Sequence, residues 1–238
     1  MNGVSHMLPF VIGGGILTAI AFLVDQPGLG TAAYGSSIPA AAFFKTIGGE
    51  AFGMMLPILA GFIAMSIADR PGLAPGFVGG MMSIDMGGPF NKAAYVFGTG
   101  ALTAGTTSGQ LVMASVMVGG MVPPLAIALS TTLFKSKWSK ADRDAGIVNY
   151  IMGLSFITEG AIPFAAADPG HVLPSCIIGS ALAGALSAAF GCTSPAPHGG
   201  AWVIAVIGNP VGYLAALAID SIVACLILSL WKKPYQEA

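Results

Sequence analysis

Long apolar runs with almost no charged residues set the first limit on the fold of this 238-residue chain. One long run, Leu111 to Phe134, has 24 residues and no charged side chain. About 20 apolar residues in a helix cross the hydrocarbon core of a bilayer, and Leu8–Val24 and Ala51–Ala68 are further candidates. Only 8% of the residues are charged, against about 25% in soluble domains. The sequence therefore predicts an all-α polytopic membrane protein with about five or six transmembrane helices.

Glycine and proline interrupt these runs unusually often. The chain has 34 Gly and 16 Pro, and both residues destabilise a regular helix. We expect a kink or a break at Pro123-Pro124 in the run Leu111–Phe134. We expect no regular helix over Pro71–Met82. The short stretch Ile38–Lys45 suits the membrane interface. Transporters use discontinuous helices to expose polar backbone groups to substrate; the alternative is a tightly packed bundle without a substrate.

Positive charge indicates which helix ends face the cytoplasm. The segment Lys135–Asp144 holds four cations, and Trp231–Lys233 closes the last apolar run with two more. Cytoplasmic loops are enriched in Lys and Arg, so we predict that both are cytoplasmic. An even number of crossings must then separate them, although three apolar stretches lie between. Two re-entrant segments rich in Gly and Pro, at 154–169 and 193–200, would satisfy that condition. The run Leu8–Val24 lacks a preceding cationic region and is expected to be retained as a span.

The carboxylate of Glu159 is the strongest candidate for binding a substrate. It lies in an apolar run, where ionisable groups are costly and usually functional. Gly160 and Pro163 follow it and weaken the helix at that point. A carboxylate at a broken helix can accept hydrogen bonds from sugar hydroxyls. The alternative is a structural carboxylate paired with a neighbouring helix end. We include the adjacent Thr158 among the candidate binding residues.

Further polar residues lie in apolar surroundings at two other places. His198, between Pro197 and Gly199, can donate and accept hydrogen bonds; the alternative is a histidine that only packs. Asp85, Asn91 and Lys92 are the other candidates. For these, a substrate role competes with a local one, in which Asp85 caps a helix that starts with Pro89 near Phe90, and Lys92 is a loop lysine.

Several other functions are excluded by the pattern of residues. Three histidines and three cysteines form no metal-ligand spacing, and no nucleotide-binding loop is present. The formal net charge of −1 gives no reason to expect a nucleic-acid partner. Cys176, Cys192 and Cys225 are expected to be apolar packing residues. We expect no metal and no cofactor.

Five ordered motifs resemble one known family, the membrane subunit (enzyme IIC) of the fructose-type bacterial phosphoenolpyruvate-dependent sugar phosphotransferase system. They extend over nearly the whole chain, and their residues are Gly3–Phe10, Ala68–Pro75, Asp85–Tyr95, Phe156–Pro169 and Pro195–Gly200. The resemblance implies a homodimeric permease of the bacterial inner membrane that takes up fructose or a related sugar and releases its phosphate ester inside. It also implies that Glu159 and His198 face the sugar, with Asp85, Asn91 and Lys92 in or near the same cavity.

The resemblance also has two departures. Relatives often carry a cytoplasmic domain that holds the phosphoryl group, whereas this chain is expected to be a single membrane domain, 1–238, served by separate IIA and IIB subunits. No phosphoryl-carrying residue is expected in it. The family usually has several more spans where Met82 meets Ser83 here, which indicates an internal deletion. Two alternatives therefore stay open: a proton-coupled secondary sugar transporter using Glu159, and a non-transporting remnant of the deletion.

Overall fold

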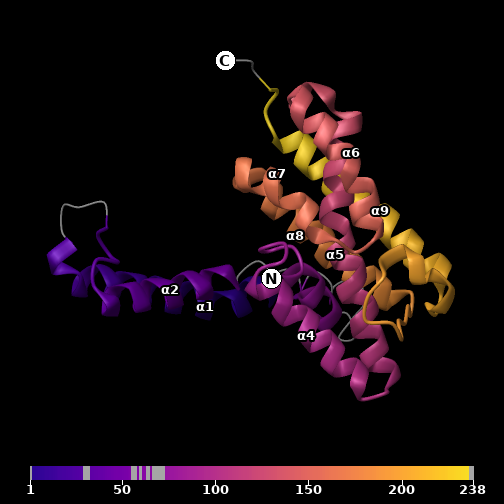
Figure 1. The fold of residues 1–238 in the computed structure, drawn as a ribbon. Coiled ribbons are helices and arrows are strands. Elements are labelled where there is room, and N and C mark those ends of the chain that lie inside the picture. Colours follow the sequence, from indigo (N-terminus) through magenta and orange to yellow (C-terminus); the bar gives the residue numbers. More distant parts are fainter. Residues whose placement is uncertain are drawn as a thin grey trace. The chain divides into compact units, whose positions relative to one another are not determined.

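The computed structural model describes residues 2–28, 33–54, 58, 61–62, 65 and 73–235, and every regular element within them is helical (Figure 1). The single β-bridge in this part of the chain, between Thr193 and Gly208, is isolated. The prediction of an all-α fold is therefore confirmed. The chain divides into two compact units, Met1–Leu59 and Ala60–Ala238.

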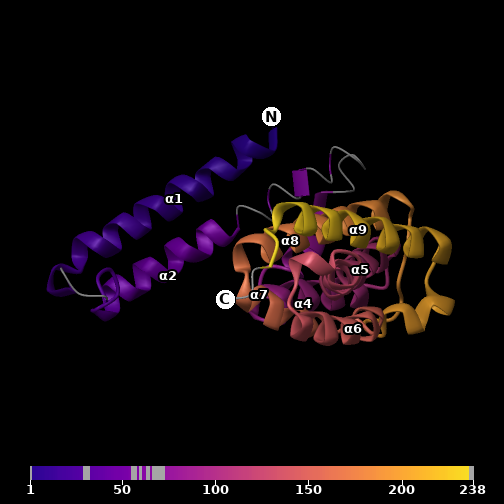
Figure 2. The same cartoon turned by 90° about the horizontal axis from the view of Figure 1, so that it is seen from above.

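The first unit is a hairpin of two antiparallel helices, α1 (Asn2–Val24) and α2 (Pro39–Gly53), which lie side by side (Figure 2). The 3-10 turn η1 (Gln26–Gly28) follows α1. Asp25, between α1 and η1 in the chain, is buried. Its carboxylate accepts hydrogen bonds from the Ser37 backbone N–H at 2.9 Å and from the Ser37 hydroxyl, just ahead of α2. This carboxylate therefore closes the connection between the helices.

Two predictions for this part of the chain meet different outcomes. The helix α1 contains the apolar run Leu8–Val24, as expected. The stretch Ile38–Lys45 is not a short separate element, because α2 continues to Gly53 as one helix of 15 residues. Most of the predicted span Ala51–Ala68 lies outside the described residues.

The second unit is a bundle around one central helix, α5 (Thr107–Leu133), which packs against α4, α6, α8 and α9. Its surrounding elements, in chain order, are α4 (Pro89–Thr103), η2 (Lys135–Lys137), α6 (Lys140–Leu154), η3 (Thr158–Ala161), α7 (Ile162–Ala167), α8 (Pro169–Ala189), η4 (Gly200–Val206) and α9 (Pro210–Trp231). In the described part of the chain, α5, α8 and α9 are long and apolar enough to cross a membrane.

The central helix is continuous through Pro123 and Pro124, so the apolar run Leu111–Phe134 is not divided into two pieces. Its start is fixed by Thr106, whose side chain accepts a hydrogen bond from the Gly109 N–H at 3.1 Å. Both prolines are fully enclosed by neighbouring helices. Such packing, rather than local propensity, holds proline-containing helices together.

Residues 73–81 are helical, so the prediction that this Gly/Pro-rich stretch has no regular helix is wrong. The glycines let the segment approach α5 and α8 closely. A Cβ atom at Gly79 would lie 2.5 Å from the Ser180 carbonyl oxygen, and one at Gly119 would lie 2.7 Å from the Gly79 Cα. Helices in membrane proteins pack closely through small residues, and this gain outweighs the weak helix propensity of glycine.

The two predicted Gly/Pro-rich interruptions are present, and they meet halfway along α5. After α6, the chain turns at Ser155 into η3 and α7, and the Thr158 hydroxyl donates to the Gly120 carbonyl at 2.9 Å. Gly120 lies near the middle of α5. The second interruption, after α8, leads into η4, where the Trp202 indole N–H donates to the Ser155 hydroxyl oxygen at 2.9 Å.

The basic segment and the C-terminus lie at the same end of the second unit (Figure 1). The Lys137 ammonium donates to the Lys232 carbonyl at 2.6 Å, and the Tyr235 N–H donates to the Ser136 carbonyl at 2.9 Å. The two long apolar helices α8 and α9 lie between these segments in the chain. This agrees with an even number of crossings, and it leaves the side of the membrane a prediction.

Candidate functional site

A cavity of about 200 Å³ lies where the two interruptions meet the start of α4. Four segments of the second unit line it, through Met82, Asn91, Tyr95, Phe156, Ile157, Thr158, Glu159 and His198. Four of the six predicted site residues are among them: Asn91, Thr158, Glu159 and His198. The prediction from the sequence therefore placed in one cavity residues, such as Asn91 and His198, that lie more than 100 positions apart in the chain.

The carboxylate of Glu159 is available to a ligand. Its Oε1 lies beside Gly87, where a Cβ atom would be only 3.0 Å away, so the backbone at Gly87 forms one wall beside the acid. The side chain is exposed in the cavity. Within the described ranges it makes no hydrogen bond or ion pair. The alternative of a structural carboxylate bonded to a helix end therefore finds no support in its contacts.

Thr158 contributes to the cavity mainly by fixing the backbone. In an α-helix the N–H of each residue donates to the carbonyl four positions earlier, and Pro124 has no N–H to give to Gly120. The Thr158 hydroxyl takes that place at 2.9 Å and is buried. This hydrogen bond ties the interruption to the middle of α5, directly beside Glu159.

The segment that begins at Asp85 has a largely structural role. The Asp85 carboxylate accepts hydrogen bonds from the Phe90 N–H at 2.8 Å and the Asn91 N–H at 2.9 Å. The helix α4 starts at Pro89, so these two hydrogen bonds favour the local role of Asp85, at the helix start, over a substrate role. Asp85 does not line the cavity. A negatively charged side chain at a helix start also complements the helix dipole.

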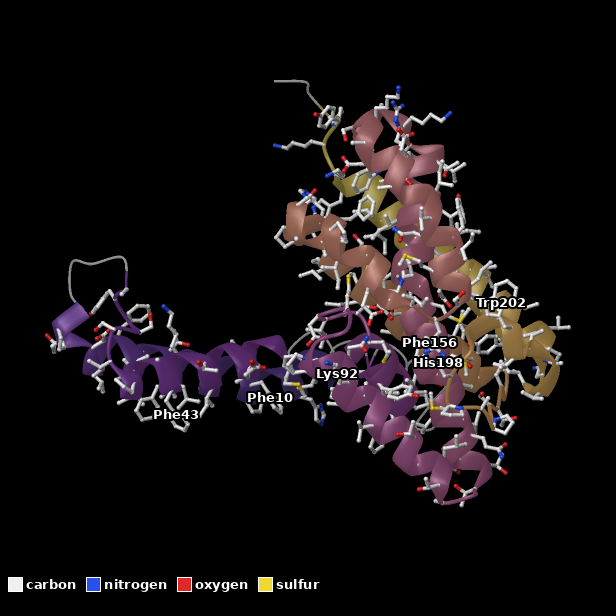
Figure 3. All side chains as sticks on the ribbon, in the orientation of Figure 1. Phe10, Phe43, Lys92, Phe156, His198 and Trp202 are labelled. Atoms are coloured by element: carbon white, nitrogen blue, oxygen red, sulfur yellow. The ribbon has the colours of Figure 1, made fainter. Side chains whose placement is uncertain are left out.

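Asn91 and Lys92 are neighbours in sequence but point to different surroundings. The Asn91 side-chain amide donates to the Met82 carbonyl at 2.6 Å, and the residue is buried against the cavity. Lys92 is exposed and is not among the lining residues (Figure 3). Asn91 also holds the Met82–Ser83 junction, where the Ser83 hydroxyl bonds to that of Ser180.

Three rings form the apolar side of the cavity, and sequence reasoning singled out only one of them. Phe156 lies with its centroid 5.2 Å from His198 and 6.3 Å from Tyr95 (Figure 3). Its backbone has φ = 63°, in the left-handed region that bulky residues rarely adopt. Gly120 makes room for the ring, since a Cβ there would be 2.4 Å from it. Tyr95 could have been found, because it follows Asn91 by four residues and shares its helix face.

The histidines, cysteines and acids in the part of the chain that the structure describes form no candidate metal site. No group of three or more His, Cys, Asp or Glu side chains there could hold a metal ion. Cys176, Cys192 and Cys225 are free thiols, and all three are buried. This is the packing environment predicted for them.

Comparison with known proteins identifies the family. No protein-family model and no solved structure matches the chain. The PTS system fructose-specific EIIABC component of Bacillus subtilis is 37% identical and covers 100% of this chain. The fructose permease IIC component of Bacillus amyloliquefaciens is 54% identical over 67% of the chain. The PTS system fructose-specific EIIB'BC component of Escherichia coli is 35% identical over 100% of it.

These relatives are longer than this chain, which spans 52%, 51% and 58% of their respective lengths. The alignment with the Bacillus subtilis protein runs over 335 positions while this chain has 238 residues, so at least 97 positions have no counterpart here. The Bacillus subtilis and Escherichia coli relatives nevertheless match over the whole chain. The chain therefore belongs to the fructose-type IIC family of the bacterial sugar phosphotransferase system.

Proposed function

We propose that this chain is a sugar permease subunit of a phosphotransferase system, and that it binds fructose or a related sugar between Glu159 and His198. The observation that carries this proposal is the small polar cavity with a carboxylate that has no other described partner. A sugar hydroxyl would donate to Glu159, and the His198 ring would donate to or accept from another hydroxyl. Charge-assisted bonds of this kind are stronger than neutral ones.

The size and lining of the cavity favour one small, partly apolar molecule. Its volume of about 200 Å³ is below the roughly 300–1,000 Å³ of sites for drug-sized ligands. Phe156 and Tyr95 would pack against the C–H surface of a sugar ring, while Asn91 and Glu159 would orient its hydroxyls. Asp85 and Lys92 would act from outside the lining, by positioning α4 and by adding positive charge nearby.

We further infer that separate IIA and IIB subunits supply the phosphoryl group. Relatives named EIIABC or EIIB'BC support this inference, because their names join IIB to IIC in one protein. Sugar phosphate would be released at the end that carries Lys135–Asp144 and the C-terminus, which we predict to be cytoplasmic. We expect a homodimer in the lipid of the bacterial inner membrane, without a cofactor and without a phosphoryl-carrying residue of its own.

We propose that residues 1–238 form one membrane domain that lacks a segment of its relatives between Met82 and Ser83. Residues 83–238 number 156, and the match to the Bacillus amyloliquefaciens permease extends over 160 positions. This near-equality supports a junction close to Met82. Both residues of the junction are buried and hydrogen-bonded, so the shortened chain packs well at this point.

Two other functions compete with this proposal, each for a specific reason. A carboxylate without a described partner suits a proton-coupled secondary transporter, in which Glu159 would carry the proton. The missing positions suit a remnant of the deletion that no longer transports. Uptake measurements separate the three functions.

The test is uptake of radiolabelled fructose by proteoliposomes that contain the full chain, with and without phosphorylated IIA and IIB inside. A phosphotransferase permease requires the phosphorylated partners and accumulates the sugar phosphate. Uptake without partners that an uncoupler abolishes would overturn the proposal in favour of proton coupling. Absence of uptake with all partners present would identify a remnant, provided that circular dichroism shows the chain to be folded.

A further inference from the structure

A second elongated groove lies in the same unit, away from the sugar cavity. Its basic end is lined by α5, η2 and α6, and its apolar end by α5, α6 and α9. It consists of two cavities of about 420 Å³ each that share Tyr150. In Figure 2, α5 lies between α6 and α9. No residue that lines the sugar cavity lines this groove.

One end of the groove is basic. Lys135, Lys140 and Arg143 line it together with a single carboxylate, Asp144. None of these cations is within ion-pair distance of a carboxylate in the ranges that the structure covers. The nearby Asp142 is occupied, because it exchanges hydrogen bonds with Ser139 at the start of α6. This end therefore carries a net positive charge, with three cations and one carboxylate.

The other end of the groove is apolar. Its walls are formed largely by leucines, with Leu125 and Leu129 from α5, Leu154 from α6, and Leu214 and Leu217 from α9. Its accessible lining has no polar surface. Tyr150 joins the two halves, and its hydroxyl donates to the Thr132 hydroxyl oxygen at 3.1 Å. A charged head would fit at the basic end and an apolar tail at the apolar end, on either side of Tyr150.

The length of the groove matches one leaflet of a bilayer. Arg143 and Leu154 lie on the same helix, 11 residues apart, which corresponds to roughly 17 Å at about 1.5 Å per residue. Half of a hydrocarbon core of about 30 Å is about 15 Å. The whole groove, from its basic end to Leu154, therefore has about the length of the hydrocarbon region of one leaflet.

We propose that this groove binds one anionic phospholipid, with its phosphate at Lys135, Lys140 and Arg143 and an acyl chain along α5 towards Leu154. Basic pockets between membrane helices are sites for anionic headgroups. A soluble anion would leave the apolar half empty, and an apolar helix from another copy of this chain would leave the cations unpaired. Only an anionic lipid satisfies both halves at once.

The first arm of the test compares headgroups. The full chain, purified in a mild detergent, is titrated with dioleoyl phosphatidylglycerol or dioleoyl phosphatidylcholine, and bound lipid is counted by native mass spectrometry. We expect a preference for phosphatidylglycerol that the double variant Lys140→Gln/Arg143→Gln weakens about 30-fold, since each surface cation contributes roughly fivefold. The control Lys45→Gln/Lys233→Gln removes two exposed cations outside the groove and should leave the preference unchanged. Equal binding of both lipids, or equal loss in both variants, overturns the proposal.

The second arm tests the acyl chain. Leu214 is 46% exposed at the apolar end, so Leu214→Trp can fill the groove without disturbing the core. This variant should bind dioleoyl phosphatidylglycerol more weakly while binding short dihexanoyl phosphatidylglycerol as the wild type does. If the dihexanoyl lipid or inorganic phosphate binds the wild type as tightly as the dioleoyl lipid, only a phosphate site exists and the proposal fails. A change of oligomeric state in Leu214→Trp with unchanged lipid binding would identify a subunit contact instead.

Discussion

Two segments of the second unit share the same order of residues but use their carboxylates in opposite ways. Asp85 and Glu159 are each followed four positions later by a proline and then by a phenylalanine, at Pro89-Phe90 and Pro163-Phe164. Asp85 accepts two backbone hydrogen bonds at the start of α4. Glu159 accepts none in the described structure, and no side chain caps α7. One acid is part of the scaffold, and the other is free for a ligand.

The backbone between acid and proline explains the difference. After Asp85 the chain turns through Met86 and Gly87, both with positive φ, and this turn brings the short carboxylate back over the new helix. Glu159 lies inside the 3-10 turn η3, which continues directly into α7. Its side chain points to Gly87 in the other segment instead. The role of an acid ahead of a proline is therefore decided by the turn between them.

The substitution Glu159→Gln should have the largest effect on function. Hydrogen bonds to charged groups contribute about 1.5–3 kcal/mol, so we expect fructose uptake to fall by about 100-fold. Thermal unfolding in detergent should stay unchanged, because the carboxylate has no described partner to lose. The control is Glu50→Gln, which neutralises an exposed carboxylate on α2. Normal uptake by Glu159→Gln would contradict the sugar site.

The substitution Asp85→Ala should act mainly on stability. It removes a side chain that accepts two hydrogen bonds at a helix start, and loss of such a cap costs about 1–2 kcal/mol. Asp85→Asn should recover part of this loss, since asparagine also caps well. Thermal unfolding and uptake per folded molecule are the two measurements. If Asp85→Ala unfolds like the wild type but does not transport, Asp85 belongs to the sugar site and the contrast with Glu159 disappears.

A variant of Thr158 sharpens the contrast between Asp85 and Glu159, because the Thr158 hydrogen bond to Gly120 fixes the backbone next to Glu159. Thr158→Val removes the donor to the Gly120 carbonyl and should cost about 1 kcal/mol. Pro124→Ala restores a backbone N–H to the same carbonyl, so Thr158→Val should cost less in that background. Unfolding of both single variants and the double variant forms a double-mutant cycle. Strict additivity would show that Thr158 does not replace the missing helical donor.

The sequence was most informative where single residues carry a strong physical constraint. A carboxylate in an apolar run is rarely tolerated without a function, which placed Glu159 correctly in the cavity. Pro89 marked the start of α4, because proline suits the first turn of a helix. The cavity itself was reachable through His198, whose Gly/Pro-rich surroundings indicated a second interruption. These inferences needed only local chemistry.

Features that depend on packing were missed. Residues 73–81 looked too rich in Gly and Pro for a helix, yet contacts with α5 and α8 make them helical. Phe156 was not singled out, because its left-handed backbone depends on the space left by Gly120. The sequence left a local and a substrate role open for Asp85 and Lys92, and only the turn geometry favours the local one. Contacts between segments that are distant in the chain cannot be predicted from the properties of single residues.

A third carboxylate, Asp168, tests the difference between carboxylates that have hydrogen-bond partners and those that have none. The expected effect is the smallest, but its pH dependence can be measured. It also precedes a proline, and it accepts from Lys232 at 2.6 Å while its other oxygen lies 2.6 Å from the His171 ring. Burial alone would raise the pKa of Asp168, but the hydrogen bonds and charges of Lys232 and His171 together hold the pKa below its usual value. Asp168→Asn should therefore destabilise the chain at pH 7, by less than about 1 kcal/mol for a single ion pair.

The sign of the pH dependence follows from that lowered pKa. The folded state binds a proton at Asp168 less readily than the unfolded state, so the ion pair contributes fully above the usual carboxyl pKa of about 4 and is lost as pH falls further. The difference in unfolding temperature between wild type and Asp168→Asn should therefore shrink as the pH falls below about 4. Lys232→Gln should give the same profile, and the double variant should be no worse than either single one. A difference that stays constant with pH would show that Asp168 acts through neutral hydrogen bonds, and a protonated Asp168 would then serve the fold as well as the charged one.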